Sequence, residues 1–222
     1  GRSIAIPSPM REGKVGSAIE QHIAFPSANI GTSDWSVLEG DEYKTSRWDT
    51  RPKFAHYSPT HLLLTNILWD HADIYPTEAS YTAVFRDLVR AVPDDGLIVA
   101  CNENEKLAEL TSDAPCYVRT YGRKDADFIY HDVAQTAGGL AFSITHREHT
   151  YPIESRLLGE FQAANLTGAF TLALHIGIPA EKIIESIASF PGMKRRLEKR
   201  YDGAMTIFDD IAHSPAKAKA TL

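Results

Sequence analysis

The amino-acid sequence predicts an α/β fold in which a mainly parallel sheet is flanked by helices and carries a small antiparallel β subsheet. Two apolar runs that suit buried strands, at 62–64 and 97–101, lie on either side of an amphipathic helix at 77–92. This order of strand, helix and strand favours parallel pairing. Short segments between residues 116 and 153, rich in β-branched and aromatic residues, predict the antiparallel part.

The composition is typical of a soluble globular protein. The 222 residues, 43% of them hydrophobic and 23% charged, suit one large domain or one domain with an appendage. The net charge of −6 argues against sequence-independent nucleic-acid binding, and no apolar run approaches the roughly 18 residues of a membrane span. Cys101 and Cys116 form neither a disulfide framework nor a zinc pattern, so we expect a cytoplasmic protein.

The first residues predict a short strand at 3–6, followed by a stretch rich in Pro and Gly. Gly13-Lys14 resembles the end of a phosphate-binding loop, where Gly-Lys is followed by Ser or Thr. Val15 stands in place of that hydroxyl residue, and Ser8 in place of the earlier glycine. A surface turn is therefore the favoured interpretation.

A polar cluster after the apolar run 62–64 is the first candidate site. Side chains of the types that bind metals and phosphates follow this run: Asn66, Asp70, His71 and Asp73. Open α/β sheets place their binding sites at the carboxyl edge of the sheet. A polar turn explains any single one of these residues, but together they favour a site.

A second cluster, Glu39-Gly-Asp-Glu-Tyr43, follows an apolar run at 35–38. Its three carboxylates repel one another unless a cation or a base compensates them, although a solvated acidic turn is the alternative. If the two strand ends lie side by side, Glu39 and His71 face one ion. Oxygen and nitrogen ligands of this kind suit magnesium or manganese.

The remaining elements follow from periodicity. Thr77 is the expected N-cap of the helix at 77–92, whose apolar residues recur at helical spacing. The stretch 159–177 predicts a buried helix, because it is apolar on most faces, and 180–188 predicts a shorter amphipathic one. Gly138-Gly139 supplies a hairpin turn. A last strand, at 205–208, leads into another acidic and histidine cluster: Asp209, Asp210 and His213.

Five segments resemble, in order and spacing, motifs of the Mur ligase family: Glu39–Tyr43, Arg51–Tyr57, Thr65–Tyr75, Met193–Glu198 and Asp209–His213. The resemblance covers the chain from about Val15 to its end. It implies a central ATP-binding domain at 1–203 and the start of a Rossmann-like C-terminal domain at 204–222.

The activity that the resemblance implies is ATP-dependent amide ligation through an acyl phosphate, in peptidoglycan recycling. UDP-N-acetylmuramate would be joined to the murein tripeptide L-alanyl-γ-D-glutamyl-meso-diaminopimelate. The segment around His71 and the Phe54-Ala-His-Tyr57 segment favour this acceptor, and L-alanine is the alternative. No nucleic-acid or membrane partner is implied.

By family position, Glu39 and His71 would be catalytic ligands of Mg²⁺ or Mn²⁺, and Asn66 would lie at the phosphate or metal site. Neutral imidazole binds metal, so His71 is interpreted as a ligand and not as a base.

Four further residues would bind ATP. Asn165 would contact adenine, and Arg196 would hold nucleotide phosphate in a catalytic role. Asp210 and His213 would close over the nucleotide.

The chain also departs from the family pattern. The Gly-Thr-x-Gly-Lys-Thr phosphate loop is absent, so we expect a fragment of a longer protein that binds ATP weakly on its own. Lys44 replaces an aspartate, Phe161-Gln162 replaces a His-Asn pair, and Ser214 replaces a histidine. Some members use a carbamylated lysine about 15 residues after the metal histidine, where this chain has Arg86.

Two other functions remain as alternatives. The first is a homologue that has lost catalysis but keeps the fold and a nucleotide or muropeptide surface. The second is a metal-dependent hydrolase that uses Glu39, Asp70 and His71.

Overall fold

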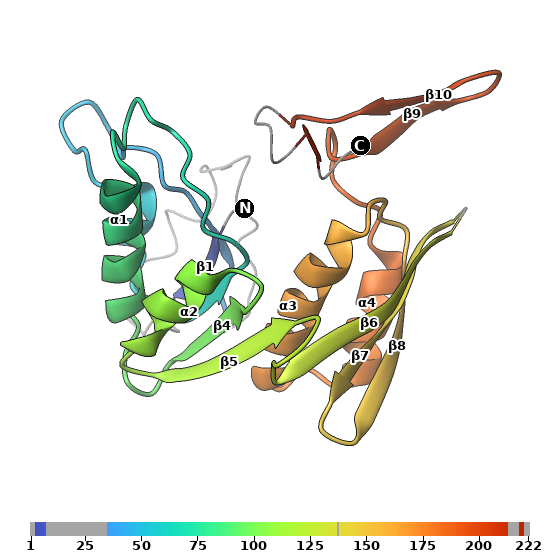
Figure 1. The fold of residues 1–222 in the computed structure, drawn as a ribbon, viewed down its shortest axis with the longest axis horizontal. Coiled ribbons are helices and arrows are strands. Elements are labelled where there is room, and N and C mark those ends of the chain that lie inside the picture. The colour runs from blue at the N-terminus through green and yellow to red at the C-terminus, as the bar shows by residue number, and fades with distance from the viewer. Residues whose placement is uncertain (1–2, 8–34, 137, 213–217, 220–222) are drawn as a thin grey trace, which may run out of the picture. The chain divides into compact units, whose positions relative to one another are not determined.

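The structure, a computed structural model, describes residues 3–7, 35–136, 138–212 and 218–219 (Figure 1). The expected turn at Gly13-Lys14 and the candidate residue His213 lie outside these residues. The chain divides into two compact units. Unit 1 comprises residues 1–100 and 104–118, and unit 2 comprises residues 101–103 and 119–222.

Unit 1 contains four strands in the order β2-β1-β3-β4. Their bounds are Ser3–Pro7 for β1, Leu38–Gly40 for β2, Pro59–Leu64 for β3 and Leu97–Cys101 for β4. β1 pairs antiparallel with both β2 and β3, whereas β3 and β4 are parallel. The expected strands at 3–6, 62–64 and 97–101 are thus confirmed, and the run at 35–38 forms its strand a few residues later.

The described residues of unit 1 also form the 3-10 helix η1 at Lys53–His56 and the α-helices α1 at Glu78–Arg90 and α2 at Glu105–Ser112. The N-cap of α1 is Thr77, as predicted. Its side chain accepts a hydrogen bond from the Ser80 amide at 3.1 Å, and the Ser80 hydroxyl accepts one from the Thr77 amide. Such a reciprocal cap stabilises a helix by about 1 kcal/mol.

The core of unit 1 lies around β3 and β4. All five residues of β4 are buried, as is typical of a strand covered on both faces. The side chains of Leu62, Leu64 and Ile98 are fully buried. The helix α1 adds the apolar stripe that the sequence predicted, with Tyr81, Phe85, Leu88 and Val89 buried.

Unit 2 contains strands in the order β5-β6-β7-β8. Their bounds are Tyr117–Gly122 for β5, Phe128–Thr136 for β6, Gly139–His146 for β7 and His149–Ser155 for β8. β5 and β6 are parallel, and β6, β7 and β8 form antiparallel hairpins. Gly139 has a φ of +142°, and a Cβ there would lie 1.9 Å from the Ser155 carbonyl oxygen, so the predicted glycine turn is required.

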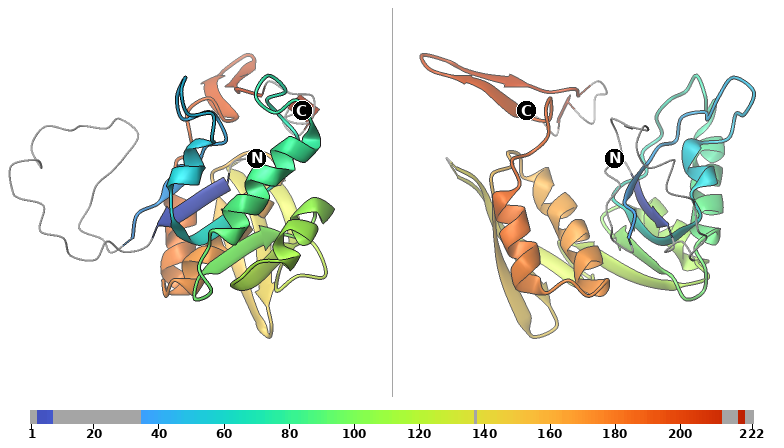
Figure 2. Two further views of the ribbon diagram at one scale, coloured as in Figure 1. Left: turned by 90° about the vertical axis from the view of Figure 1, so that its left-hand side faces the viewer. Right: turned by 180° about the vertical axis from the view of Figure 1, so that it is seen from behind.

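Two helices of unit 2, α3 at Phe161–His175 and α4 at Ala180–Ser189, lie side by side against this antiparallel sheet (Figures 1 and 2). α3 is buried over most of its surface, as its composition predicted. Parallel strands, flanking helices and an antiparallel subsheet together confirm the α/β fold class. No helix among the described residues has the length and apolarity to cross a membrane.

The last two strands, β9 at Glu198–Asp202 and β10 at Thr206–Asp209, form a separate antiparallel pair. The sequence predicted β10 but not β9. β10 therefore ends in a two-stranded sheet of its own. The assignment of 204–222 to a C-terminal domain remains a prediction.

Candidate functional site

The carboxyl ends of β2 and β3 lie at the same edge of the unit 1 sheet, because each strand runs antiparallel to β1. Ile4 of β1 is opposite both Glu39 and Leu63. Neighbouring strands are about 4.8 Å apart, so β2 and β3 are separated by about 10 Å. The expectation that the two strand ends are direct neighbours is therefore wrong, and Glu39 lies exposed on the outer strand.

The loop after β3 is held in a defined conformation by its own hydrogen bonds. His71 has a φ of 59°, which is uncommon for a residue with a side chain. Its amide donates to Asp70 Oδ1 at 2.9 Å, and its carbonyl accepts from the amides of Ile74 and Tyr75. The indole of Trp69 donates to the Tyr75 carbonyl at 2.9 Å. These bonds fix where the imidazole of His71 points.

That imidazole meets Glu42, which the sequence reasoning had not chosen. His71 Nε2 lies 2.9 Å from Glu42 Oε1. The Tyr75 hydroxyl donates to the Glu42 carbonyl at 2.5 Å, and the ring of Tyr43 lies 4.3 Å from the His71 ring. Glu42 belongs to the acidic cluster Glu39–Tyr43 of the sequence. Its position in that cluster, three residues after Glu39, is the sequence feature that could have identified it.

Each acid of the cluster has its own environment. Lys53 Nζ donates to Asp41 Oδ2 at 2.7 Å, and this bond raises the pKa of Lys53. The amide of Phe54, a residue only 2% exposed, donates to the Asp41 carbonyl. Lys53 thus compensates the charge of Asp41, and the His71 ring contacts Glu42. Glu39 lies exposed on the strand itself.

The carboxylates also act on two nearby phenols. Burial raises the pKa of Tyr75 to about 12, with a contribution from Glu42. Burial, with the carboxylates of Asp73, Asp70 and Glu42, also raises the pKa of Tyr43. Both phenols therefore stay neutral at physiological pH, and the Tyr75 hydroxyl keeps the proton that it donates to the Glu42 carbonyl.

The side chain of Asn66 is bound by Asn104, a second residue that the sequence reasoning missed. Asn104 Nδ2 donates to Asn66 Oδ1 at 2.6 Å and to the Ile67 carbonyl at 3.2 Å. Asn104 is also the N-cap of α2, since its Oδ1 accepts from the Lys106 amide at 3.0 Å. The sequence analysis assigned no element to 102–115, although Asn followed by Glu is a helix-start signal.

The candidate residues of unit 2 occupy two places. Asn165 lies exposed on α3, where its Nδ2 donates to Gln162 at 3.1 Å. Asp210 accepts from the Leu197 amide at 2.8 Å and from the Ala212 amide at 2.6 Å. This carboxylate therefore joins the segment of Arg196 to the chain after β10.

The donor set of the unit 1 edge, an imidazole nitrogen and carboxylate oxygens, suits Mg²⁺ or Mn²⁺. With Nε2 donating to Glu42, a neutral His71 keeps its lone pair on Nδ1, which lies 4.0 Å from Asp70 Oδ1. Within the part of the chain that the structure describes, no three His, Cys, Asp or Glu side chains form a group that could hold an ion. An ion here would complete its shell with water and phosphate, as Mg²⁺ commonly does. The hydrolase alternative, which requires Glu39, Asp70 and His71 together, gains no support.

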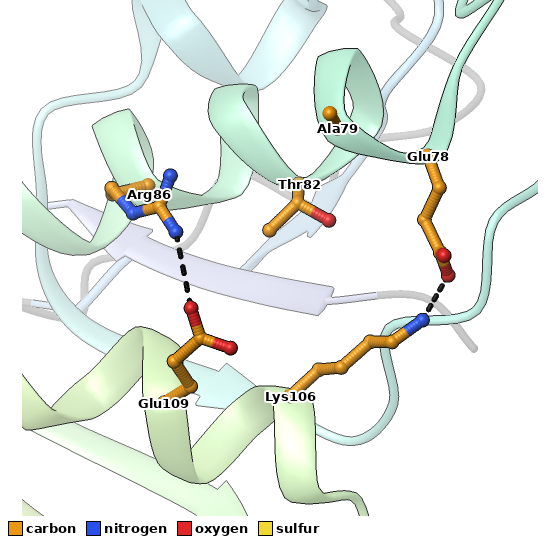
Figure 3. A pocket seen from close by; sticks show the side chains of 6 residues that line it. All are labelled: Glu78, Ala79, Thr82, Arg86, Lys106 and Glu109. Carbon is orange, nitrogen blue, oxygen red and sulfur yellow. Dashed lines mark hydrogen bonds and ion pairs between the residues drawn. The ribbon is translucent and has the colours of Figure 1, made fainter.

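Arg86 lies away from this edge, in a shallow groove between α1 and α2 (Figure 3). It is 3.6 Å from Glu109, and Lys106 is paired with Glu78 in the same groove. Arg86 thus serves a surface ion pair, a type of contact that contributes little to stability.

Comparison with known proteins identifies the family of the chain. Residues 19–173 match the Mur ligase middle domain. The chain is 31% identical over 198 residues to the UDP-N-acetylmuramate–L-alanyl-gamma-D-glutamyl-meso-2,6-diaminoheptandioate ligase of Haemophilus influenzae, covering 88% of the chain and 43% of the relative. It is 32% identical over 199 residues to the UDP-N-acetylmuramate–L-alanine ligase of an Anaeromyxobacter species, covering 88% and 42%.

A solved structure shares the fold. The crystal structure of UDP-N-acetylmuramate:L-alanyl-gamma-D-glutamyl-meso-diaminopimelate ligase from Neisseria meningitides has a TM-score of 0.62 at 28% identity, and the match covers 70% of this chain and 48% of that one. The chain thus spans less than half the length of each of these relatives. Because the family match covers most of the sequence, the chain belongs to the Mur ligase family.

Proposed function

We propose that the protein containing this chain joins UDP-N-acetylmuramate to L-alanyl-γ-D-glutamyl-meso-diaminopimelate, as a ligase of peptidoglycan recycling in the bacterial cytoplasm. The observation that carries the proposal is the 31% identity, over 198 residues, to a relative named for this reaction. ATP phosphorylates the muramyl carboxylate, and the amine of the tripeptide attacks the acyl phosphate. An amide forms, and ADP and phosphate are released.

In this proposal, Glu39 and His71 hold the divalent ion. The ion would neutralise phosphate charge during phosphoryl transfer. Glu42 and Tyr43 pack around His71 and hold its ring in place, while Asn66 lies beside the phosphates. The contact between His71 and Glu42 supports this assignment because it fixes an imidazole at the sheet edge.

The nucleotide contacts from unit 2 are Asn165, Arg196, Asp210 and His213. Arg196 supplies a positive charge for the phosphates, which a guanidinium binds well. The bonds of Asp210 to the amides of Leu197 and Ala212 support a role in holding this segment in shape. Asn165 presents an exposed amide, the kind of group that recognises adenine by hydrogen bonds.

Ligation to L-alanine is the second candidate, favoured by the 32% identity to an L-alanine ligase. The two functions share the activation step and differ only in the amine that attacks.

The test is ADP release by the complete protein with UDP-N-acetylmuramate, ATP and Mg²⁺, once with the tripeptide and once with L-alanine. We expect release that depends on the tripeptide, and a ligated product of the corresponding mass. Faster release with L-alanine would establish the second candidate. No ADP release with either acceptor would indicate a homologue that has lost catalysis.

A further inference from the structure

The orientation of the Asn66 side-chain amide follows from a chain of hydrogen bonds that begins in the backbone. The Lys106 amide at the start of α2 donates to Asn104 Oδ1 at 3.0 Å. The oxygen of the Asn104 amide is thereby assigned, and its nitrogen must point the other way. That nitrogen meets two acceptors, the Ile67 carbonyl at 3.2 Å and Asn66 Oδ1 at 2.6 Å.

Two backbone groups therefore determine which end of Asn66 is engaged. An amide has one oxygen, which accepts, and one NH2 group, which donates. The oxygen of Asn66 is occupied by Asn104, so its NH2 group is the end left for a ligand. None of the described residues accepts a hydrogen bond from that NH2 group, and Asn66 is only half-buried.

We propose that Asn104 is a positioning residue that makes Asn66 a hydrogen-bond donor to a phosphate oxygen of the nucleotide, and not a ligand of the metal ion. A metal ion requires a lone pair, which the NH2 group lacks, and Asn104 already donates to one of the two lone pairs of Asn66 Oδ1. An anionic phosphate oxygen requires donors, which the free NH2 group supplies. The inference rests on the proposed function, because it takes nucleotide as the ligand.

The variant Asn104→Asp separates this role from helix capping. The new carboxylate still accepts from the Lys106 amide, so the cap of α2 is kept. It has no donor for Asn66, whose amide must then turn its NH2 group toward that carboxylate and present its oxygen to the ligand. The variant Asn66→Asp also places an oxygen at that position, while Asn104 keeps its partner. In both variants, an oxygen atom that accepts hydrogen bonds replaces the NH2 group of Asn66 where the ligand binds.

The experiment measures KM for ATP, kcat and Mg²⁺ dependence for the complete protein and for Asn104→Asp, Asn66→Asp and the double variant. We expect either single change to raise KM for ATP about 10- to 100-fold, the range for a lost bond to a charged group. The Mg²⁺ concentration for half-maximal activity at saturating ATP stays unchanged. The double variant places two carboxylates against each other, so we expect it to raise KM for ATP at least as much as the more impaired single variant does.

Thr77→Ala is the matched control, since it removes the cap of α1 without touching Asn66, and it should leave KM for ATP unchanged. A wild-type KM for ATP in Asn104→Asp, or a shifted Mg²⁺ requirement with unchanged KM, overturns the inference while ligation by the wild type upholds the proposed function. If the wild type neither ligates nor binds ATP, both fail. Direct titration with ADP decides the inference if the wild type binds nucleotide without turnover.

Discussion

The imidazole of His71, the proposed metal ligand, contacts the carboxylate of Glu42, with 2.9 Å between Nε2 and Oε1. Each side chain is only 12% exposed. A hydrogen bond to a carboxylate in such a place is stronger than one at the surface, because little water competes for it. Glu42 thereby ties the loop after β2 to the loop after β3, and the two loops define the candidate site together.

We expect Glu42→Ala to lower the free energy of unfolding by about 1–3 kcal/mol, since it leaves His71 Nε2 without its acceptor. Glu39→Ala is the matched control, because it removes the same carboxylate three residues earlier from an exposed position. Its effect on stability should stay within about 0.5 kcal/mol. Urea unfolding followed by tryptophan fluorescence measures both. Equal destabilisation by the two variants would show that the contact of Glu42 with His71 contributes nothing special.

We expect the His71→Asn variant to stay folded but to lose the wild-type dependence of the ligation rate on Mg²⁺ concentration. Asparagine tolerates the positive φ of 59° at this position, so a loss of activity cannot be assigned to backbone strain. The measurement is ADP release against Mg²⁺ concentration, with circular dichroism as the check on folding. Unaltered magnesium dependence would remove His71 from the metal site.

Most strands and helices of the fold could be predicted, because local sequence determines them. The apolar run Leu62-Leu63-Leu64 predicts a buried strand, and Thr77 followed by an apolar stripe predicts the start of a helix. The pairing of His71 could not be predicted, because it depends on β1 lying between β2 and β3. β1 separates Glu39 from the loop after β3. Which of the two acids, Glu39 or Glu42, contacts His71 therefore depends on the tertiary structure.

Two short elements escaped prediction for a related reason. α2 has eight residues, and its buried side chains, Leu107, Leu110 and Thr111, are too few for a clear periodic signal. β9, at Glu198–Asp202, is rich in charged residues and pairs only with β10. Its residues favour no strand by themselves, since charged side chains are depleted in strands. The register of a partner strand is needed to find it.

Tyr75 should make stability depend on pH in the alkaline range. Its pKa is raised from 10.0 to about 12, chiefly by burial, so the folded state holds its proton more tightly than the unfolded state does. Its contribution is therefore complete below about pH 10 and is lost as the pH rises toward 12. Tyr75→Phe should show a smaller loss of stability between pH 10 and 12. Unfolding by urea at several pH values measures this, and parallel pH profiles for the two proteins would contradict it.

Asp210 should protect the basic segment Lys194-Arg195-Arg196 from proteolysis, because its carboxylate accepts hydrogen bonds from the amides of Leu197 and Ala212. Asp210→Ala removes both bonds at once and lets the segment open locally. We expect trypsin to cut after these basic residues about 10-fold faster, consistent with the loss of about 1.4 kcal/mol or more of local stability. Asp209→Ala is the control, since Asp209 lies 3.8 Å from Arg195 in an exposed ion pair that contributes little. Mass spectrometry of the first cleavage products identifies the sites. If both variants are cut at the wild-type rate, Asp210 does not hold the segment, and its role is limited to contacts with the nucleotide.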